Sequence, residues 1–126
     1  MAVRAVRGAV QVDTDSRDDI LEGSAELVTA MLERNDLVAD DIISIVFTAT
    51  PDLTAEFPAY AARLLGLTDV PLLSATEIDV PGSLRRTVRL LAHVETERSR
   101  SELRHPYLRG AAVLRRDLPQ DLWRAA

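Results

Sequence analysis

Several residue types on which many enzymes depend are absent or scarce in this chain of 126 residues. There is no cysteine, which excludes disulfides, thiolate zinc sites and cysteine nucleophiles. There is also no lysine, because all 15 positively charged residues are arginines. This excludes the lysine of a phosphate-binding P-loop and the lysine of Schiff-base enzymes. The two histidines, His93 and His105, are too few to suggest a metal site, so whole classes of catalytic chemistry are ruled out.

The length and composition fit one globular domain. Hydrophobic residues make up 47% and charged residues 28%, which is neither a disordered nor a fibrous composition. We therefore predict a single domain over residues 1–126, with a short tail from about residue 117 that carries Trp123. No apolar run approaches the roughly 18 residues of a membrane helix. The first residues lack the apolar segment of a secretory signal, and with the lack of cysteine this predicts a cytoplasmic location.

The charge is unevenly distributed along the chain. The formal net charge is -5, but residues 1–63 hold 5 Arg against 12 acids, whereas residues 64–126 hold 10 Arg against 8 acids. An acidic protein with an arginine-rich second half is a poor candidate for non-specific nucleic-acid binding. The same distribution allows a local pocket for a small anion.

The hydrophobic pattern predicts alternating strands and helices. Ser16 is the expected N-cap of the first helix, and Asn35 and Asp36 its end. The almost continuously apolar strand that follows is expected to be central and buried on both faces. Strands are predicted over residues 3–12, 42–50, 72–76, 87–95 and 108–114, and helices over about 17–34 and 58–65. This order predicts an α+β fold of two layers, a mixed β-sheet with helices on one face.

Four arginines fall on elements that are expected to be internal. Guanidinium groups bind carboxylates in bidentate geometry, so four of them with few acids nearby predict a small dianionic ligand. Arg89 lies in the middle of a strand, whose stiff backbone would hold its guanidinium in place. Each of these arginines also fits a structural ion pair, and Glu77 is a candidate partner for Arg89. The four are Arg7, Arg63, Arg89 and Arg115.

Three separated sets of residues follow one another in a recognisable order. They are 4–9 near the start, 48–53 with 57–59 in the middle, and 104–108 with 114–118 near the end. With these motifs, which read RAVRGA, TATPDL with FPA, and RHPYL with LRRDL, the chain resembles the monofunctional chorismate mutases of the AroH class over nearly its whole length. The resemblance implies an isomerase that converts chorismate to prephenate in the shikimate route to phenylalanine and tyrosine. It also implies a homotrimeric pseudo-barrel with active sites between adjacent subunits, without cofactor, metal, nucleic-acid or membrane partner.

The resemblance implies roles for individual side chains. Arg89 corresponds to the arginine that donates to the breaking ether oxygen. Glu77 corresponds to the acid that accepts a hydrogen bond from the ring hydroxyl of the substrate. The remaining matches are Arg7 and Tyr107 for the side-chain carboxylate, Phe57 and Leu114 for apolar walls, and Arg63 and Arg115 for cations near the pocket mouth.

Two positions depart from the pattern of the related enzymes. Ser74 stands where a cysteine contacts the substrate hydroxyl, and serine can also form that hydrogen bond. Tyr60 replaces a lysine near the pocket entrance and so removes a positive charge. Ser74 and Glu77 are three residues apart, which places them on opposite faces of a regular strand. If both contact one hydroxyl, the strand must end or bulge between Ala75 and Glu77.

The implied reaction fits what the sequence lacks. A [3,3] rearrangement moves no proton and forms no covalent intermediate, so a chain without an evident base or nucleophile can catalyse it. Two alternatives stay open. One is an imine-hydrolysing reactive-intermediate deaminase on the same trimeric fold, in which Arg89 would bind a carboxylate and Glu77 would position water. The other is a non-catalytic trimer that binds a metabolite of the aromatic pathway.

Overall fold

The structure is a computed structural model that describes residues 1–115, and the predicted tail with Trp123 lies outside them. The elements in chain order are β1 (Ala2–Gln11), α1 (Arg17–Arg34), η1 (Ala39–Asp41), β2 (Ile42–Ala49), α2 (Ala59–Leu64), β3 (Leu72–Thr76), β4 (Thr87–Thr96), η2 (Arg100–Glu102), β5 (Tyr107–Leu108) and η3 (Arg109–Arg115). The predicted helices and the first four predicted strands are confirmed to within one or two residues at each end.

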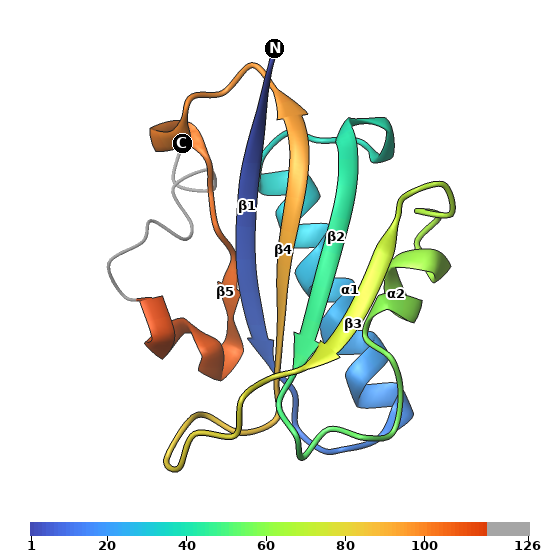
Figure 1. The fold of residues 1–126 in the computed structure, drawn as a ribbon, viewed down its shortest axis with the longest axis vertical. Helices are drawn as coiled ribbons and strands as arrows, with labels where there is room; N and C mark the ends of the chain where they lie inside the picture. Colours follow the sequence, from blue (N-terminus) through green and yellow to red (C-terminus); the bar gives the residue numbers. More distant parts are fainter. Residues whose placement is uncertain (116–126) are drawn as a thin grey trace.

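The strands form one five-stranded mixed sheet in the order β3-β2-β4-β1-β5. β4 pairs antiparallel with both β1 and β2. The outer pairs, β1 with β5 and β2 with β3, are parallel. Both α-helices lie on the same face of this sheet (Figure 1). The predicted α+β architecture of two layers is therefore confirmed.

Local sequence signals account for the bounds of α1. The Ser16 hydroxyl accepts the Asp19 N–H at 3.1 Å, as an N-cap does. At the other end Asn35 is buried, and its amide donates to the Met31 carbonyl at 2.9 Å. Between these ends, one stripe of α1 is fully buried against the sheet and includes Ile20, Leu27, Val28 and Met31.

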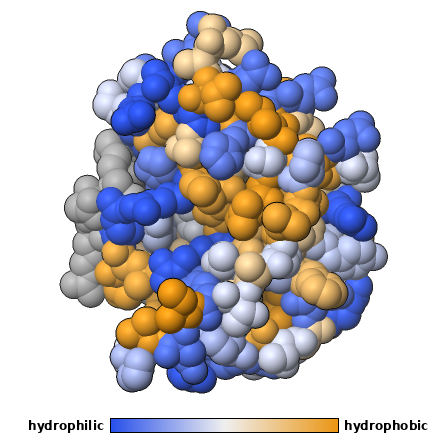
Figure 2. Space-filling view, in the orientation of Figure 1, coloured by the Kyte–Doolittle hydropathy of each residue, from blue (hydrophilic) through white to orange (hydrophobic). Residues whose placement is uncertain are grey.

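The hydrophobic core lies between the helices and the sheet, so alternate strand residues are buried. Phe47 is the largest fully buried side chain. The opposite face of the sheet has no helical cover (Figure 1) and carries an apolar patch over its centre (Figure 2). Large apolar side chains on the strands remain exposed, among them Val3, Leu73 and Leu91. No helix in the described part of the chain is long and apolar enough to cross a membrane.

Two expectations for the strands are wrong. β4, not β2, is the central strand, and β2 is only half-buried on its outer face at Ser44, Val46 and Thr48. The apolar run of β2 predicted burial on both faces of the strand. Only the face toward the helices is buried, because no helix within residues 1–115 covers the other face of the sheet (Figure 1). The strand predicted over 108–114 is instead the end of β5 followed by the 3-10 helix η3. The reason is that Arg109 adopts φ 54°, which takes the backbone out of the extended conformation.

Candidate active site

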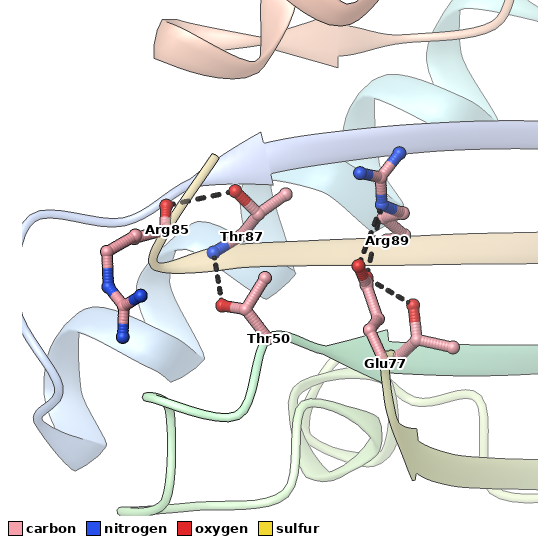
Figure 3. Close-up of polar contacts among 6 residues, drawn as sticks. Thr50, Glu77, Arg85, Thr87 and Arg89 are labelled. Carbon is pink, nitrogen blue, oxygen red and sulfur yellow. Dashed lines mark hydrogen bonds and ion pairs between the residues drawn. The ribbon is translucent and has the colours of Figure 1, made fainter. Parts of the chain in front are cut away.

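An ion pair between Arg89 and Glu77 lies near the start of β4, on the uncovered face of the sheet. Arg89 is on β4, opposite Thr48 of β2 in the register of the sheet. The Arg89 Nε donates to both carboxylate oxygens of Glu77 at 3.1 Å (Figure 3). The Thr48 hydroxyl donates to the same carboxylate at 2.7 Å. The carboxylate thus holds the guanidinium by its Nε alone, and the two Nη atoms lie on the side away from Glu77.

The side chains of this pair are neither buried nor freely exposed. The Arg89 side chain is 38% exposed and that of Glu77 is 16% exposed. A purely structural ion pair would satisfy both groups, yet within residues 1–115 the Nη atoms of Arg89 form no hydrogen bond. These donors therefore remain available to an anionic or polar ligand.

The strand β3 ends directly before Glu77. β3 ends at Thr76, and the Glu77 N–H donates to the Ala49 carbonyl at 2.9 Å. The regular strand therefore does not run through Glu77, which is what a shared contact of Ser74 and Glu77 to one hydroxyl would require. Ser74, however, pairs in register with the buried Phe47, and its hydroxyl accepts the Ala59 N–H of α2 at 3.4 Å. Within one chain Ser74 faces the helices, whereas Glu77 faces Arg89.

Hydrogen bonds two residues before Arg89 fix the start of β4. The Thr87 N–H donates to the buried Thr50 hydroxyl at 3.0 Å (Figure 3). Asp52 accepts the N–H of Arg86, which adopts φ 51°, at 2.9 Å. Although burial acts in the opposite direction, hydrogen bonds from Thr50 and Arg86 lower the pKa of the Asp52 carboxyl. The backbone therefore reaches Arg89 from an anchored turn.

Arg89 lines a cavity of about 350 Å³ together with Arg7 and Tyr107, here called the Arg89 cavity. Tyr107 is buried on β5, and Leu114 of η3 packs against the small cluster that contains it. Arg115, the next residue, is half-buried. The structure thus brings Arg7, Arg89 and Tyr107 to one cavity and places Leu114 beside the cluster that contains Tyr107. Arg7 was expected to be internal, which is wrong for this chain, since its side chain is exposed on the uncovered face.

The other predicted site residues line a second cavity of about 540 Å³, here called the Phe57 cavity. Its lining includes Phe57, Tyr60, Arg63 and Ser74. Phe57 is 69% exposed, so it is not a core residue of this chain. Arg63 is also exposed, contrary to the expectation that it is internal. Arg7, Arg89 and Tyr107 therefore line one cavity, whereas Phe57, Tyr60, Arg63 and Ser74 line another.

Asp15 fixes the loop that leads to Phe57. Its carboxylate accepts the N–H groups of Thr54 and Ala55 at 2.9 and 3.0 Å and the Thr54 hydroxyl at 2.9 Å. The bond from the Thr54 N–H is the main reason that the pKa of the Asp15 carboxyl lies below its ordinary value. The loop between β1 and α1 is thereby tied to the segment that precedes Phe57.

The two cavities suit an anion better than a metal ion. Arginines line both of them, and a guanidinium stays protonated at any physiological pH. Among residues 1–115, no group of three or more His, Asp or Glu side chains is placed to hold a metal. The arrangement can bind carboxylates and place a fixed positive charge beside a reacting oxygen.

Comparison with known proteins identifies the family. Residues 3–118 match the family described as chorismate mutase type I. The chain belongs to this family. It is 46% identical over 117 residues to the chorismate mutase AroH of Thermus thermophilus, a match that covers 92% of this chain and 96% of the relative. It is 38% identical over 119 residues to the chorismate mutase AroH of Bacillus subtilis (strain 168), covering 94% of each chain.

The fold agrees with that of a solved member of the chorismate mutase family. A chorismate mutase structure from Clostridium thermocellum superposes with a TM-score of 0.86 at 46% identity. The match covers 87% of this chain and 98% of that structure. The resemblance read from the motifs is therefore confirmed over nearly the whole chain.

Two residues that support the site were not predicted in that role. Thr48 holds Glu77, and only the register of β2 against β4 shows that it faces Arg89. Asn35 was predicted only as a helix end. Its side chain also accepts the Arg104 N–H at 2.7 Å and donates to the Arg104 carbonyl at 2.8 Å. This pair of bonds anchors the segment that leads to Tyr107, and pairing over such a distance in sequence leaves no local signal.

His105 fastens that segment to β1, and we expect acid to weaken the contact. Its Nδ1 accepts the Arg7 N–H at 3.1 Å, so this nitrogen must be unprotonated. Burial, together with the nearby Arg104 charge, lowers the pKa of His105. Since the unfolded chain then binds the proton more readily, the free energy of unfolding falls as pH drops through the ordinary histidine value of about 6.5.

The His105→Asn variant tests this linkage by thermal unfolding at a series of pH values. Asparagine offers an oxygen close to the place of Nδ1 but does not titrate. Its Tm should fall less than that of the parent between about pH 7.5 and 5. His93→Asn, which leaves His105 in place, is the matched control and should retain that part of the slope. Parallel curves for the parent and the His105 variant would contradict the expectation.

Proposed function

We propose that this chorismate mutase rearranges chorismate to prephenate at a site built around Arg89 and Glu77. Membership of the family and close identity to two named chorismate mutases support the reaction. The assignment of the site is based on the hydrogen bonds of Arg89 and on the cavity that it lines. Glu77 holds its Nε, whereas its Nη donors are unused by residues 1–115 and the side chain lines a cavity with Arg7 and Tyr107.

The chemistry needs positioning and charge stabilisation rather than proton transfer. In a [3,3] rearrangement the C–O bond of the enol ether breaks while a C–C bond forms, and no proton is moved. The protein must hold the flexible substrate in a compact conformer with the two reacting carbons close together. It must also stabilise negative charge that grows on the ether oxygen. A guanidinium on a central strand can do the second without changing its protonation state.

We assign the polar groups that line the Arg89 cavity, and Glu77 beside it, to different parts of the substrate. Arg89 donates through Nη to the ether oxygen, and Glu77 accepts from the ring hydroxyl. The Glu77 carboxylate can take this further bond because two oxygens offer about four acceptor directions. Arg7 and Tyr107 hold the side-chain carboxylate, while Leu114 forms an apolar wall.

The complete site in this proposal joins the Arg89 cavity of one copy to the Phe57 cavity of the next. Phe57 and Ser74 then contact the ring from the neighbouring copy, and Arg63 and Arg115 lie near the mouth. This arrangement accounts for the separation of Ser74 from Glu77 within one chain. It also accounts for the exposed apolar patch on the uncovered sheet face (Figure 2), because a homotrimeric pseudo-barrel would cover it.

A direct assay tests the activity. The absorbance of chorismate should fall on addition of the protein, and prephenate should accumulate in equal amount. Turnover of an imine substrate without loss of chorismate would instead favour the deaminase alternative. Binding of chorismate without turnover would favour the non-catalytic trimer. Activity in the soluble fraction of disrupted cells would support the cytoplasmic location that is part of this proposal.

Mixing two inactive variants tests whether copies share the site. Arg89→Gln disables one half, and Phe57→Asp disables the other by placing a carboxylate against a dianion. In co-refolded trimers about a quarter of the sites should combine the two intact halves, so activity should return to about that share. If both halves came from one chain, the mixture would stay inactive. A trimeric mass in sedimentation is the accompanying control.

A further inference from the structure

Arg17 begins α1 at a position where the helix gives a cation no support. The N-terminus of a helix carries partial positive charge, so Arg17 is disfavoured there, whereas the following Asp18 and Asp19 are favoured. Tertiary contacts hold the side chain instead. The Arg17 Nε donates to Glu56 at 3.0 Å, and its Cζ lies 5.7 Å from the centroid of the Tyr60 ring, within cation–π range.

These contacts fix the guanidinium without saturating it. Glu56 is itself held, because its second oxygen accepts the Phe57 N–H at 2.9 Å. Only the Nε of Arg17 is engaged, and in the described part of the chain its Nη atoms make no hydrogen bond. The side chain is 55% exposed and lines the Phe57 cavity. The geometry is that of Arg89 beside Glu77, with a carboxylate holding Nε and the two terminal nitrogens free.

Arg17 also decides the charge of the Phe57 cavity. The charged residues among its lining are Arg17, Arg63 and Glu56, which together give one net positive charge. Without Arg17 the other two cancel. Tyr60 carries no charge itself, although the resemblance places a lysine at its position. The stacked guanidinium of Arg17 therefore restores a cation beside that ring.

We propose that Arg17 is a capture residue for the dianionic substrate, acting at the mouth of the site from the Phe57 side. This inference rests on the proposed chorismate mutase activity and adds a residue to its binding machinery. Arg17 attracts a carboxylate during approach and does not touch the reacting atoms. It therefore acts on the second-order rate constant and not on the chemical step.

Steady-state kinetics of Arg17→Gln test the inference. We expect kcat/KM to fall about three- to tenfold through KM, with kcat unchanged, and the salt dependence of kcat/KM to become shallower. Arg100→Gln removes the same charge from an exposed residue that lies outside the Phe57 cavity. This control should keep the parent values.

A second variant separates capture from a structural role. Arg17→Gln combined with Tyr60→Lys returns a cation to the same place without restoring the contact to Glu56. It should recover most of kcat/KM and of the salt dependence. Lack of recovery, a fall in kcat alone, or an unchanged KM in Arg17→Gln would each overturn the inference. A parent protein with no activity on chorismate would instead refute the proposed function, so the two failures are distinguishable.

Discussion

Arg89→Gln is expected to lower kcat by about three orders of magnitude or more while KM changes far less. Loss of one neutral donor to a developing oxyanion lowers kcat by about 10²–10³ in other enzymes, and Arg89 supplies a full positive charge. Its effect falls mainly on kcat because the ether oxygen carries extra negative charge only in the transition state. Chorismate absorbance over a range of concentrations measures both constants.

The competing interpretation of Arg89 is an ion pair that only stabilises the sheet. The double variant Arg89→Gln with Glu77→Gln distinguishes the two, since it replaces the charged pair by a neutral pair of similar shape. A structural role predicts that the double variant regains stability and activity together. The catalytic role predicts that Tm recovers and kcat does not. Near-normal kcat in Arg89→Gln with an intact fold would refute the electrostatic mechanism.

Much of the fold follows from local signals in the sequence. Ser16 caps α1 as predicted, and Gly66, at φ 98°, ends the turn after α2. These elements are predictable because cap chemistry and helical periodicity act over a few residues. The prediction of a strand over 108–114 is wrong because one residue changes the backbone direction. A single left-handed residue, Arg109, ends β5 after Leu108, and the pattern of apolar residues does not reveal it.

The site could be predicted in its parts but not in its arrangement. Arg89 and Glu77 meet as expected, and β3 ends before Glu77. Which face a residue occupies depends on sheet pairing, so Thr48 was missed. Arg17 reaches its cavity from the start of a helix, through contacts to residues about 40 positions away, and periodicity describes only the helix that it begins.

Gly8→Ala is expected to destabilise the fold and to disturb the site more than its single methyl group suggests. Gly8 is buried on β1, and a Cβ there would collide with the Pro106 carbonyl oxygen and lie 3.1 Å from Leu27 Cδ1. That carbonyl accepts the Ala9 N–H at 2.9 Å, so it cannot move without weakening the contact between β1 and β5. Overpacking of this kind lowers the free energy of unfolding by about 1–3 kcal/mol.

The same collision links stability to catalysis because Pro106 directly precedes Tyr107. If the β5 segment shifts to relieve it, Tyr107 moves relative to Arg7, and we expect kcat/KM to fall about tenfold or more at a temperature where the variant is folded. Val94→Ala is the matched control, since Val94 is fully buried on β4 but pairs with Arg4 and Ile42 at the far end of the sheet. It should lower Tm while leaving kcat/KM near the parent value. If Gly8→Ala lost stability but kept full activity, the β5 segment would not be what positions Tyr107, and the proposed clamp on the substrate carboxylate would need another support.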